Sequence, residues 1–178
     1  TILKFINKFD NFIYLKSDLI IAQSDSFKKH LERNYNLSNK IYTLHQPADY
    51  SFQRFVKKKL RYTYITYAGN FGQAQDFKTI INAFKSNRVN KNIKLNLIGS
   101  GKKFKFIQNL IEKNDLKNKI ILKPYMNKKK LFKILKSSSA FYITLKNGKS
   151  LNKTIPGKFQ SYISFGKPIL ISSNSDLN

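Results

Sequence analysis

The sequence predicts an α/β fold, an open parallel sheet with helices on both of its faces. Short apolar runs of strand length alternate with longer segments in which apolar side chains recur at helical spacing. Such alternation is typical of βαβ units, which place their strands in parallel. Glycine-bearing turns follow two of the expected strands, and open parallel sheets bind ligands beyond the carboxyl ends of their strands. We therefore expect a ligand site at that edge of the sheet.

The first part of the chain holds two helices and two strands. The expected helices are residues 2–15 and 25–35, and the expected strands are 19–22 and 41–44. Ser24 is a good N-cap for the second helix, and Asp25 suits its first turn because an acidic side chain complements the helix dipole there. The second strand ends before Pro47, since the residue before a proline favours extended geometry and breaks the pattern.

From residue 62 onward the alternation is regular. The expected strands are 62–67, 94–98, 120–122 and 140–145, and the expected helices are 75–86, 102–113 and 128–136. Turns Gly69–Gly72 and Gly99–Gly101 follow the first two strands, and Asn127 is an N-cap for the third helix. Residues 146–155 are expected to form a polar loop. The aromatic side chains at helical spacing in these segments are predicted to belong to the core.

The stretch 154–171 contains the strongest local signal for an anion. Pro156 suits a first helical position, Gly166 ends the helix, and residues 169–171 follow as a buried strand. Lys158 then lies in the first turn, where the helix dipole disfavours a cation. Exposed helical N–H groups beside a lysine bind phosphate well. A site for the phosphates of a nucleotide is therefore the working hypothesis.

The composition excludes some classes of protein. The sequence has 34 Lys and Arg against 9 Asp and Glu, and the formal charge of +25 attracts phosphates, nucleic acid or anionic lipid. The excess is mostly Lys, which an AT-rich coding sequence also produces, and scarce Arg argues against a specific nucleic-acid reader. The absence of Cys excludes disulfides and thiolate metal sites and fits a cytoplasmic protein. No apolar run approaches the roughly 18 residues that span a bilayer.

Three motifs in this order together resemble one family. They are Tyr67-Ala68-Gly69-Asn70-Phe71-Gly72, Ile98-Gly99-Ser100-Gly101, and Ile155-Pro156-Gly157-Lys158 followed by Tyr162 and Gly166-Lys167-Pro168. The chain resembles the C-terminal, donor-binding half of a GT-B glycosyltransferase of family four (glycosyl transferases group 1). Within that family it is similar to L-fucosamine or N-acetylglucosamine-type transferases of surface-polysaccharide synthesis. The segments 18–24 and 45–49 resemble the last strand ends of the family's N-terminal domain.

The resemblance implies a domain organisation. Residues 1–47 correspond to the end of an N-terminal, acceptor-side Rossmann-like domain that is mostly missing, and residues 48–61 to an interdomain linker. Residues 62–178 correspond to a C-terminal nucleotide-sugar-binding domain that is truncated at its end. The chain is accordingly expected to be a fragment, without its true start.

The resemblance also implies an activity: transfer of a sugar from a UDP-sugar to a lipid-linked glycan, with retention and without a metal or other cofactor. The enzyme would be cytoplasmic and peripheral on the inner face of the membrane. With no metal, fixed dipoles and cations must stabilise the charge of the leaving diphosphate. The expected diphosphate-binding residues are Gly69, Asn70, Gly72, Pro156, Gly157 and Lys158. Tyr125, Met126 and Ser161 are expected at the nucleoside, and His45 on the acceptor side.

The chain departs from the family pattern at four positions. The broader family has Arg and Lys in the first glycine turn, where this chain has Asn70 and Gln75. It also has two glutamates that correspond to Lys153 and Ser161. The loss of these carboxylates weakens the expected ribose contact, so Lys158 carries more of the prediction.

Other functions remain open on the sequence alone. The glycines are also typical of ordinary turns, and Lys158 of a solvated surface. A basic nucleic-acid-binding protein would need a cationic stripe with interleaved aromatics, whereas the lysines here are scattered. A GT-B nucleotide-sugar epimerase would need carboxylates and a histidine around the cleft. An inactive remnant is the third alternative. The 9 acidic residues lack metal-ligand spacing, and His30 is expected to lie on the surface of a helix.

Overall fold

The computed structural model describes residues 2–35, 37, 39–47, 63–86, 88–148 and 151–173. In chain order its elements are α1 (Ile2–Lys16), β1 (Ile20–Ala22), α2 (Asp25–Tyr35), β2 (Ile41–Thr43), β3 (Thr63–Ala68), α3 (Phe77–Lys85), β4 (Ile93–Ile98), α4 (Phe104–Lys113), β5 (Ile120–Lys123), α5 (Lys128–Ser137), β6 (Ala140–Thr144), the 3₁₀ turn η2 (Leu151–Lys153), α6 (Gly157–Ile163) and β7 (Ile169–Ser172). We call residues 2–47 the N-terminal unit and residues 63–173 the C-terminal unit. The expected linker, 48–61, lies outside the described residues.

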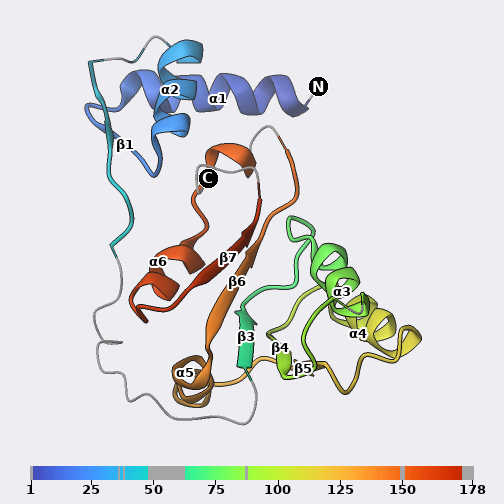
Figure 1. Ribbon diagram of the computed structural model, residues 1–178. Helices are drawn as coiled ribbons and strands as arrows, with labels where there is room; N and C mark the ends of the chain where they lie inside the picture. The colour runs from blue at the N-terminus through green and yellow to red at the C-terminus, as the bar shows by residue number, and fades with distance from the viewer. Residues whose placement is uncertain are drawn as a thin grey trace.

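The C-terminal unit is built on a parallel sheet with the strand order β5-β4-β3-β6-β7. Helices α3 and α4 cover one face, and α5 and α6 cover the other (Figure 1). The sheet separates two apolar clusters because side chains of a strand alternate between its faces. Tyr67 packs with α3 and α4, whereas its neighbour Ala68 packs with α5 and α6. The predicted α/β class, with helices on both faces, is confirmed.

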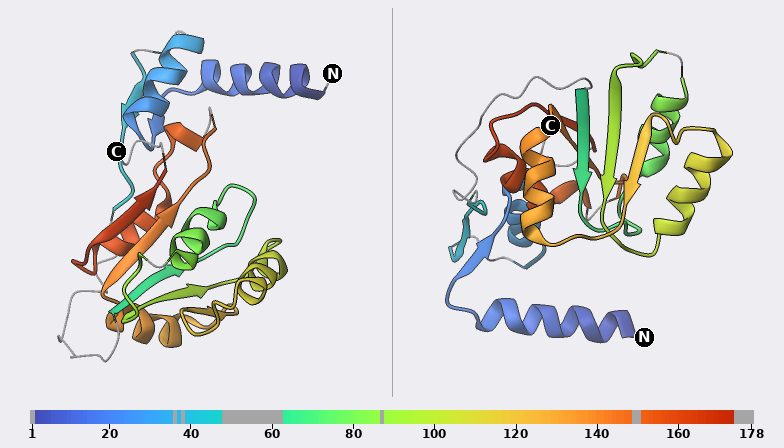
Figure 2. Two further views of the ribbon diagram at one scale, coloured as in Figure 1. Left: turned by 45° about the vertical axis from the view of Figure 1, so that its right-hand side comes forward. Right: turned by 90° about the horizontal axis from the view of Figure 1, so that it is seen from below.

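The N-terminal unit is smaller. Its strands β1 and β2 pair in parallel, with Ile20 opposite Ile41, and α2 packs on them through the buried Leu31. Ser24 caps α2 as predicted, since its hydroxyl accepts a hydrogen bond from the N–H of Phe27 at 3.1 Å. Helix α1 lies apart from the C-terminal sheet (Figure 2). The side chains of Phe5 and Phe9 on this helix are exposed. Within the described ranges, no helix combines the length and apolar character that a membrane span requires.

The structure corrects several predicted boundaries. The helix expected from residue 75 begins at Phe77, because Asp76 is its N-cap and accepts from the N–H of Lys78 at 3.1 Å. The helix expected at residue 102 begins at Phe104. The segment 146–155 is not entirely irregular, since residues 151–153 form η2.

The stretch that follows the polar loop differs in three further ways from its prediction. Pro156 is the N-cap of α6 with extended geometry, ψ 131°, so it is not the first helical residue. The helix ends at Ile163, before Gly166, whose φ of +58° turns the chain. Strand β7 is not the buried strand that was predicted, because it lies at the edge of the sheet. Leu170 is 45% exposed, and the other residues of the strand are partly buried.

Tyr162 joins α6 to the end of β3. Its hydroxyl accepts from the N–H of Ala68 at 2.8 Å and is 3.3 Å from the carbonyl oxygen of the same residue. The side chain is 2% exposed, and its ring stacks on Phe141 with the centroids 4.4 Å apart. Burial raises the pKa of this phenol, so the hydroxyl stays neutral and keeps its proton.

We expect Tyr162→Phe to lower the free energy of unfolding by about 1 to 3 kcal/mol, the usual cost of a buried donor left without its acceptor. Urea denaturation followed by circular dichroism measures the change. Tyr125→Phe is the matched control, because Tyr125 is 74% exposed and loses no buried contact. Equal midpoints for the two variants would contradict a role for the phenol in holding β3 to α6.

Candidate functional site

Two glycine turns lie side by side at the carboxyl edge of the central sheet. The N–H of Gly69 donates to the carbonyl of Ile98 at 2.9 Å, and that of Phe71 donates to Ser100 at 2.7 Å. A Cβ on Gly99 would lie only 1.8 Å from the carbonyl oxygen of Gly69. Glycine at position 99, with φ +151°, is therefore what allows the two backbones to approach so closely.

Lys158 reaches from α6 over the first of these turns. A Cβ on Gly69 would lie 2.5 Å from Cε of Lys158 and 3.2 Å from its Nζ. The ammonium group also lies 5.1 Å from the ring centroid of Tyr67, a cation–π distance. In the described part of the chain it makes no ion pair with a carboxylate. Burial lowers the pKa of Lys158, because a desolvated ammonium is disfavoured. A bound anion would compensate this buried charge.

A pocket of about 370 Å³ opens beside this lysine, between α5 and α6, and we call it the α5–α6 pocket. Its lining includes Lys128, Leu131, Phe132, Lys158, Ser161 and Tyr162. The wall is largely apolar, and the end near the first glycine turn holds Lys158, which lies against Gly69, and the Tyr162 hydroxyl, which bonds to Ala68. An apolar chamber with a few polar groups at one end is the usual form of a small-molecule site.

The remaining residues of the first glycine turn have different surroundings from those expected. The N–H of Gly69 donates to Ile98, so this residue offers no donor to a ligand, and its missing side chain makes room for Lys158. A Cβ on Gly72 would meet the side chains of Asn70 at 2.9 Å and Gln75 at 3.0 Å, so that space is filled by the protein itself. The N–H of Gly72 donates to the side-chain oxygen of Gln75 at 2.9 Å. The turn is thus braced internally.

A lysine that the sequence analysis did not single out stands at this turn. The ammonium group of Lys103 donates to the carbonyl oxygen of Gln75 at 2.8 Å. Burial and the nearby charge of Lys146 lower its pKa. A cation is therefore present where the sequence has Asn70 and Gln75 in place of basic residues. Its only sequence signal was its position just after the second glycine turn.

The expected nucleoside residues divide into two groups. Ser161 lines the α5–α6 pocket together with Lys158. Tyr125 is exposed, and Met126 packs partly buried against the cluster under α5 and α6, so the side chains of both lie outside the lining of the pocket. Gly157 also lines it, whereas Pro156 does not. Lys128, at the start of α5, is a lining residue that the sequence analysis did not assign.

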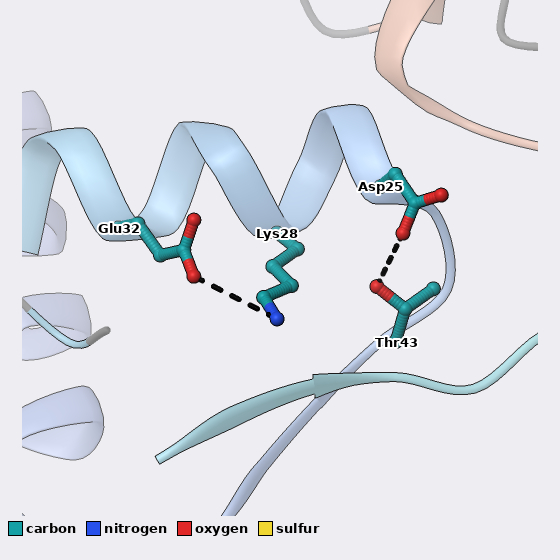
Figure 3. Close-up of polar contacts among 4 residues, drawn as sticks. All are labelled: Asp25, Lys28, Glu32 and Thr43. Atoms are coloured by element: carbon teal, nitrogen blue, oxygen red, sulfur yellow. Dashed lines mark hydrogen bonds and ion pairs between the residues drawn. The ribbon is translucent and has the colours of Figure 1, made fainter. Parts of the chain in front are cut away.

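A larger cleft of about 710 Å³ lies between the N-terminal and C-terminal units, and we call it the inter-unit cleft. Its lining includes Asp25, Lys29, His45, Gln46, Phe159 and Gln160. His45, expected on the acceptor side, lies here with Nδ1 3.1 Å from the carbonyl oxygen of Gln23. Asp25 accepts from the hydroxyl of Thr43 at 2.7 Å (Figure 3). The cleft therefore has charged groups on one wall and mainly apolar groups from α6 on the other.

One contact between the two units was absent from the sequence analysis. Nζ of Lys153 lies 2.7 Å from Nδ1 of His30, and the hydroxyl of Ser24 donates to the carbonyl of Lys153 at 2.5 Å. His30 was expected to lie on the surface, and it is half-buried in this contact. Lys153 and His30 are 123 positions apart, and no local sequence pattern links residues so distant from each other. Across the ranges that the structure describes, no group of three acidic or histidine side chains is arranged to hold a metal ion.

Comparison with solved structures gives the same fold for chains of low sequence identity. The apo lipopolysaccharide outer core galactosyltransferase WaaB is 16% identical with a TM-score of 0.70, over 90% of this chain and 44% of that one. A glycosyltransferase from Rickettsia africae is 14% identical with a TM-score of 0.73, over 94% and 48%. A TarM variant of S. aureus, crystallised with fondaparinux, α-GlcNAc-glycerol and UDP, is 15% identical with a TM-score of 0.72, over 93% and 32%. The chain thus spans less than half the length of these structures, and the shared fold is that of GT-B glycosyltransferases.

A search of curated proteins finds no match. The model of the family described as "Glycosyl transferases group 1" matches residues 49–176, which is more than half of the chain. That segment contains both glycine turns, Lys158 and the α5–α6 pocket. Together with the parallel sheet and the solved structures of the same fold, this match shows that the chain belongs to the group 1 glycosyltransferase family.

Proposed function

We propose that the chain binds a nucleotide-sugar donor, with the diphosphate between Lys158 and the Gly69 turn and the nucleoside in the α5–α6 pocket. The observation that carries the proposal is the position of the Lys158 ammonium, 3.2 Å from where a Cβ of Gly69 would be. Because position 69 has no side chain, Lys158 packs directly against this turn, and a phosphate bound at the turn would meet the ammonium group. The charge of the ligand would offset the desolvation that lowers the pKa of this lysine.

The other residues at this edge have secondary roles in the proposal. The N–H of Asn70, which has no acceptor among the described residues, faces no competitor for a phosphate oxygen. Lys103, on the Gln75 carbonyl, adds positive charge at the same turn. Ser161 and Lys128 line the pocket where ribose hydroxyls would lie. Hydrogen bonds within the chain hold the Gly69 turn and Lys103 in place, and such preorganised groups stabilise a leaving diphosphate without a metal.

The activity proposed for the protein is retaining, metal-independent transfer of a sugar from a UDP-sugar to a lipid-linked glycan in surface-polysaccharide synthesis. Family membership supports sugar transfer, and the inter-unit cleft beside α6 offers the place for an acceptor. His45 is proposed on the acceptor side, since it lines this cleft. The formal charge of +25 supports peripheral contact with an anionic membrane. The domain limits 1–47, 48–61 and 62–178 are part of the same proposal.

The test is calorimetric titration of the chain with UDP, uridine and inorganic pyrophosphate. We expect saturable binding of UDP, and an affinity that falls about 10- to 100-fold in Lys158→Met, as for a lost charge-assisted hydrogen bond of about 1.5 to 3 kcal/mol. Uridine affinity should be almost unchanged in the variant, whereas pyrophosphate affinity should fall with that of UDP. The variant should not unfold at a lower temperature, because it removes a buried ammonium that has no carboxylate partner.

Lys91→Met is the matched control for this titration. Lys91 is exposed and precedes β4, so it lies at the amino edge of the sheet, opposite the proposed site. Its replacement changes the net charge by the same amount and should leave UDP affinity within about twofold, because a distant exposed charge is screened by salt. No UDP binding by the unmodified chain, or equal losses in the two variants, would overturn the proposal.

A further inference from the structure

Lys153 and His30 form a polar contact that joins the two units at one end of the inter-unit cleft. Lys153 belongs to η2 and His30 to α2, and Nζ lies 2.7 Å from Nδ1. The amide nitrogen of Asn34 lies 2.9 Å from the same Nδ1. Two donors on one ring nitrogen require that this nitrogen carry no proton. The contact as seen therefore needs a neutral imidazole with its proton on Nε2.

The contact is part of a built interface and not a chance approach of two surface side chains. Ser24 is fully buried, and its hydroxyl donates to the carbonyl oxygen of Lys153 at 2.5 Å while it accepts from Phe27 N–H at 3.1 Å. The backbone of η2 is held in turn by Thr154, whose hydroxyl donates to the carbonyl of Leu151 at 2.9 Å. The α2 N-terminus and η2 are thus fixed against each other.

The charged groups around His30 would repel the imidazole if it were protonated. From η2 the charged group that faces it is Lys153, and on α2 the contacting side chains are the uncharged Phe27 and Asn34. The carboxylates of α2 are engaged elsewhere, Asp25 with Thr43 and Glu32 with Lys28 at 3.8 Å (Figure 3). Among the described residues, neither His30 nor Lys153 forms an ion pair with a carboxylate. A protonated His30 would therefore bring two uncompensated cations together.

We propose that Lys153 is a positioning residue that holds the inter-unit cleft closed through neutral His30, and that protonation of His30 opens it. Lys158 follows Lys153 by five positions, so the same contact fixes the segment that leads into α6. The proposal concerns the arrangement of the two units and is independent of the proposed function.

The direction of the pH dependence follows from the pKa of His30. Burial and the charge of Lys153 lower it from the ordinary value of 6.5 in the closed arrangement. A group whose pKa is lowered in one state favours that state fully above its ordinary pKa and progressively less below it. The closed arrangement should therefore be fully favoured above pH 6.5 and should weaken as the pH falls below that value.

The experiment measures energy transfer between two dyes on the full chain. The sequence contains no Cys, so Asn11→Cys on α1 and Asn109→Cys on α4, both exposed, provide unique attachment sites. We expect constant transfer efficiency from pH 8 to 7 and a reversible fall between pH 6.5 and 5.5, with circular dichroism unchanged. His30→Gln, which keeps an acceptor and does not titrate, should abolish the fall, and so should Lys153→Met.

The chain has only two histidines, which gives a matched control. His45→Gln removes the other one, which lines the cleft without touching Lys153, and should retain the fall in transfer. Transfer that does not change with pH in the unmodified chain would overturn the proposal. A fall that persists in His30→Gln or Lys153→Met, or disappears in His45→Gln, would overturn it as well.

Discussion

Gly99→Ala is expected to lower the free energy of unfolding by about 2 to 6 kcal/mol, a large part of the 5 to 15 kcal/mol typical of a domain. The new Cβ would lie 1.8 Å from the carbonyl oxygen of Gly69 and 2.9 Å from its carbonyl carbon, both of which are backbone atoms. A backbone cannot rotate away as a side chain can, so the two turns must separate. Overpacking contributes about 1 to 3 kcal/mol and the positive φ about 1 to 3 kcal/mol more.

Urea denaturation of both proteins measures this change, with Gly166→Ala as the control. Gly166 also has a positive φ, +58°, but a Cβ there would meet nothing within 4 Å. The control therefore isolates the backbone strain, about 1 to 2 kcal/mol for a left-handed alanine. Equal losses in the two variants would show that the close approach of the turns is not tight in solution.

Gly69→Ala is expected to reduce UDP affinity by at least about 100-fold, more than the loss of Lys158 alone. The added methyl group would lie 2.5 Å from Cε of Lys158, so the lysine side chain must move and its ammonium must leave its position. The methyl group would also crowd a phosphate bound at the turn. The stability cost should be smaller than that of Gly99→Ala, because the clashing atoms belong to the end of a flexible side chain. Calorimetric titration with UDP measures the effect.

The double variant Gly69→Ala, Lys158→Met separates the two causes. If alanine acts partly by displacing the lysine, the losses of binding free energy in the two single variants will sum to more than the loss in the double variant. Additive losses would mean that the methyl group acts only by blocking the ligand. Unchanged affinity in Gly69→Ala would remove the Gly69 turn from the proposed site.

The course of the chain could be predicted from the sequence because it depends on short-range signals. Within the described residues, the apolar runs place the seven strands within one or two residues of where the structure has them, and the caps at Ser24 and Asn127 are confirmed. Helix starts were less accurate. Helix α3 begins two residues later than predicted because Asp76 is its N-cap. Pro156 has extended geometry and is the N-cap of α6, not its first helical residue. Asp76 and Pro156 each suit either the N-cap or the first helical position, and the conformation of the preceding turn determines which position the residue takes.

Other features depended on which strands become neighbours. The run at 169–171 is apolar enough for a central strand, but among the described strands β7 pairs with β6 alone and lies at the edge of the sheet. Gly72 has the spacing of a ligand-binding glycine, yet the side chains of Asn70 and Gln75 fill the space beside it. Tyr125 has no contact with the α5–α6 pocket, which is lined by Lys128 from the following helix. Such packing is not encoded in local periodicity.

The sequence by itself determined the alternation of strands and helices, the glycine turns at one edge of the sheet, and the unusual lysine near the start of α6. Only the tertiary structure placed Lys158 over Gly69, Lys103 on Gln75 and Lys153 against His30. Local signals act over a few residues through backbone sterics and capping. These contacts join residues 89, 28 and 123 positions apart. They exist only because the parallel strand order brings the carboxyl ends of distant strands to one edge, with the N-terminal unit docked beside it.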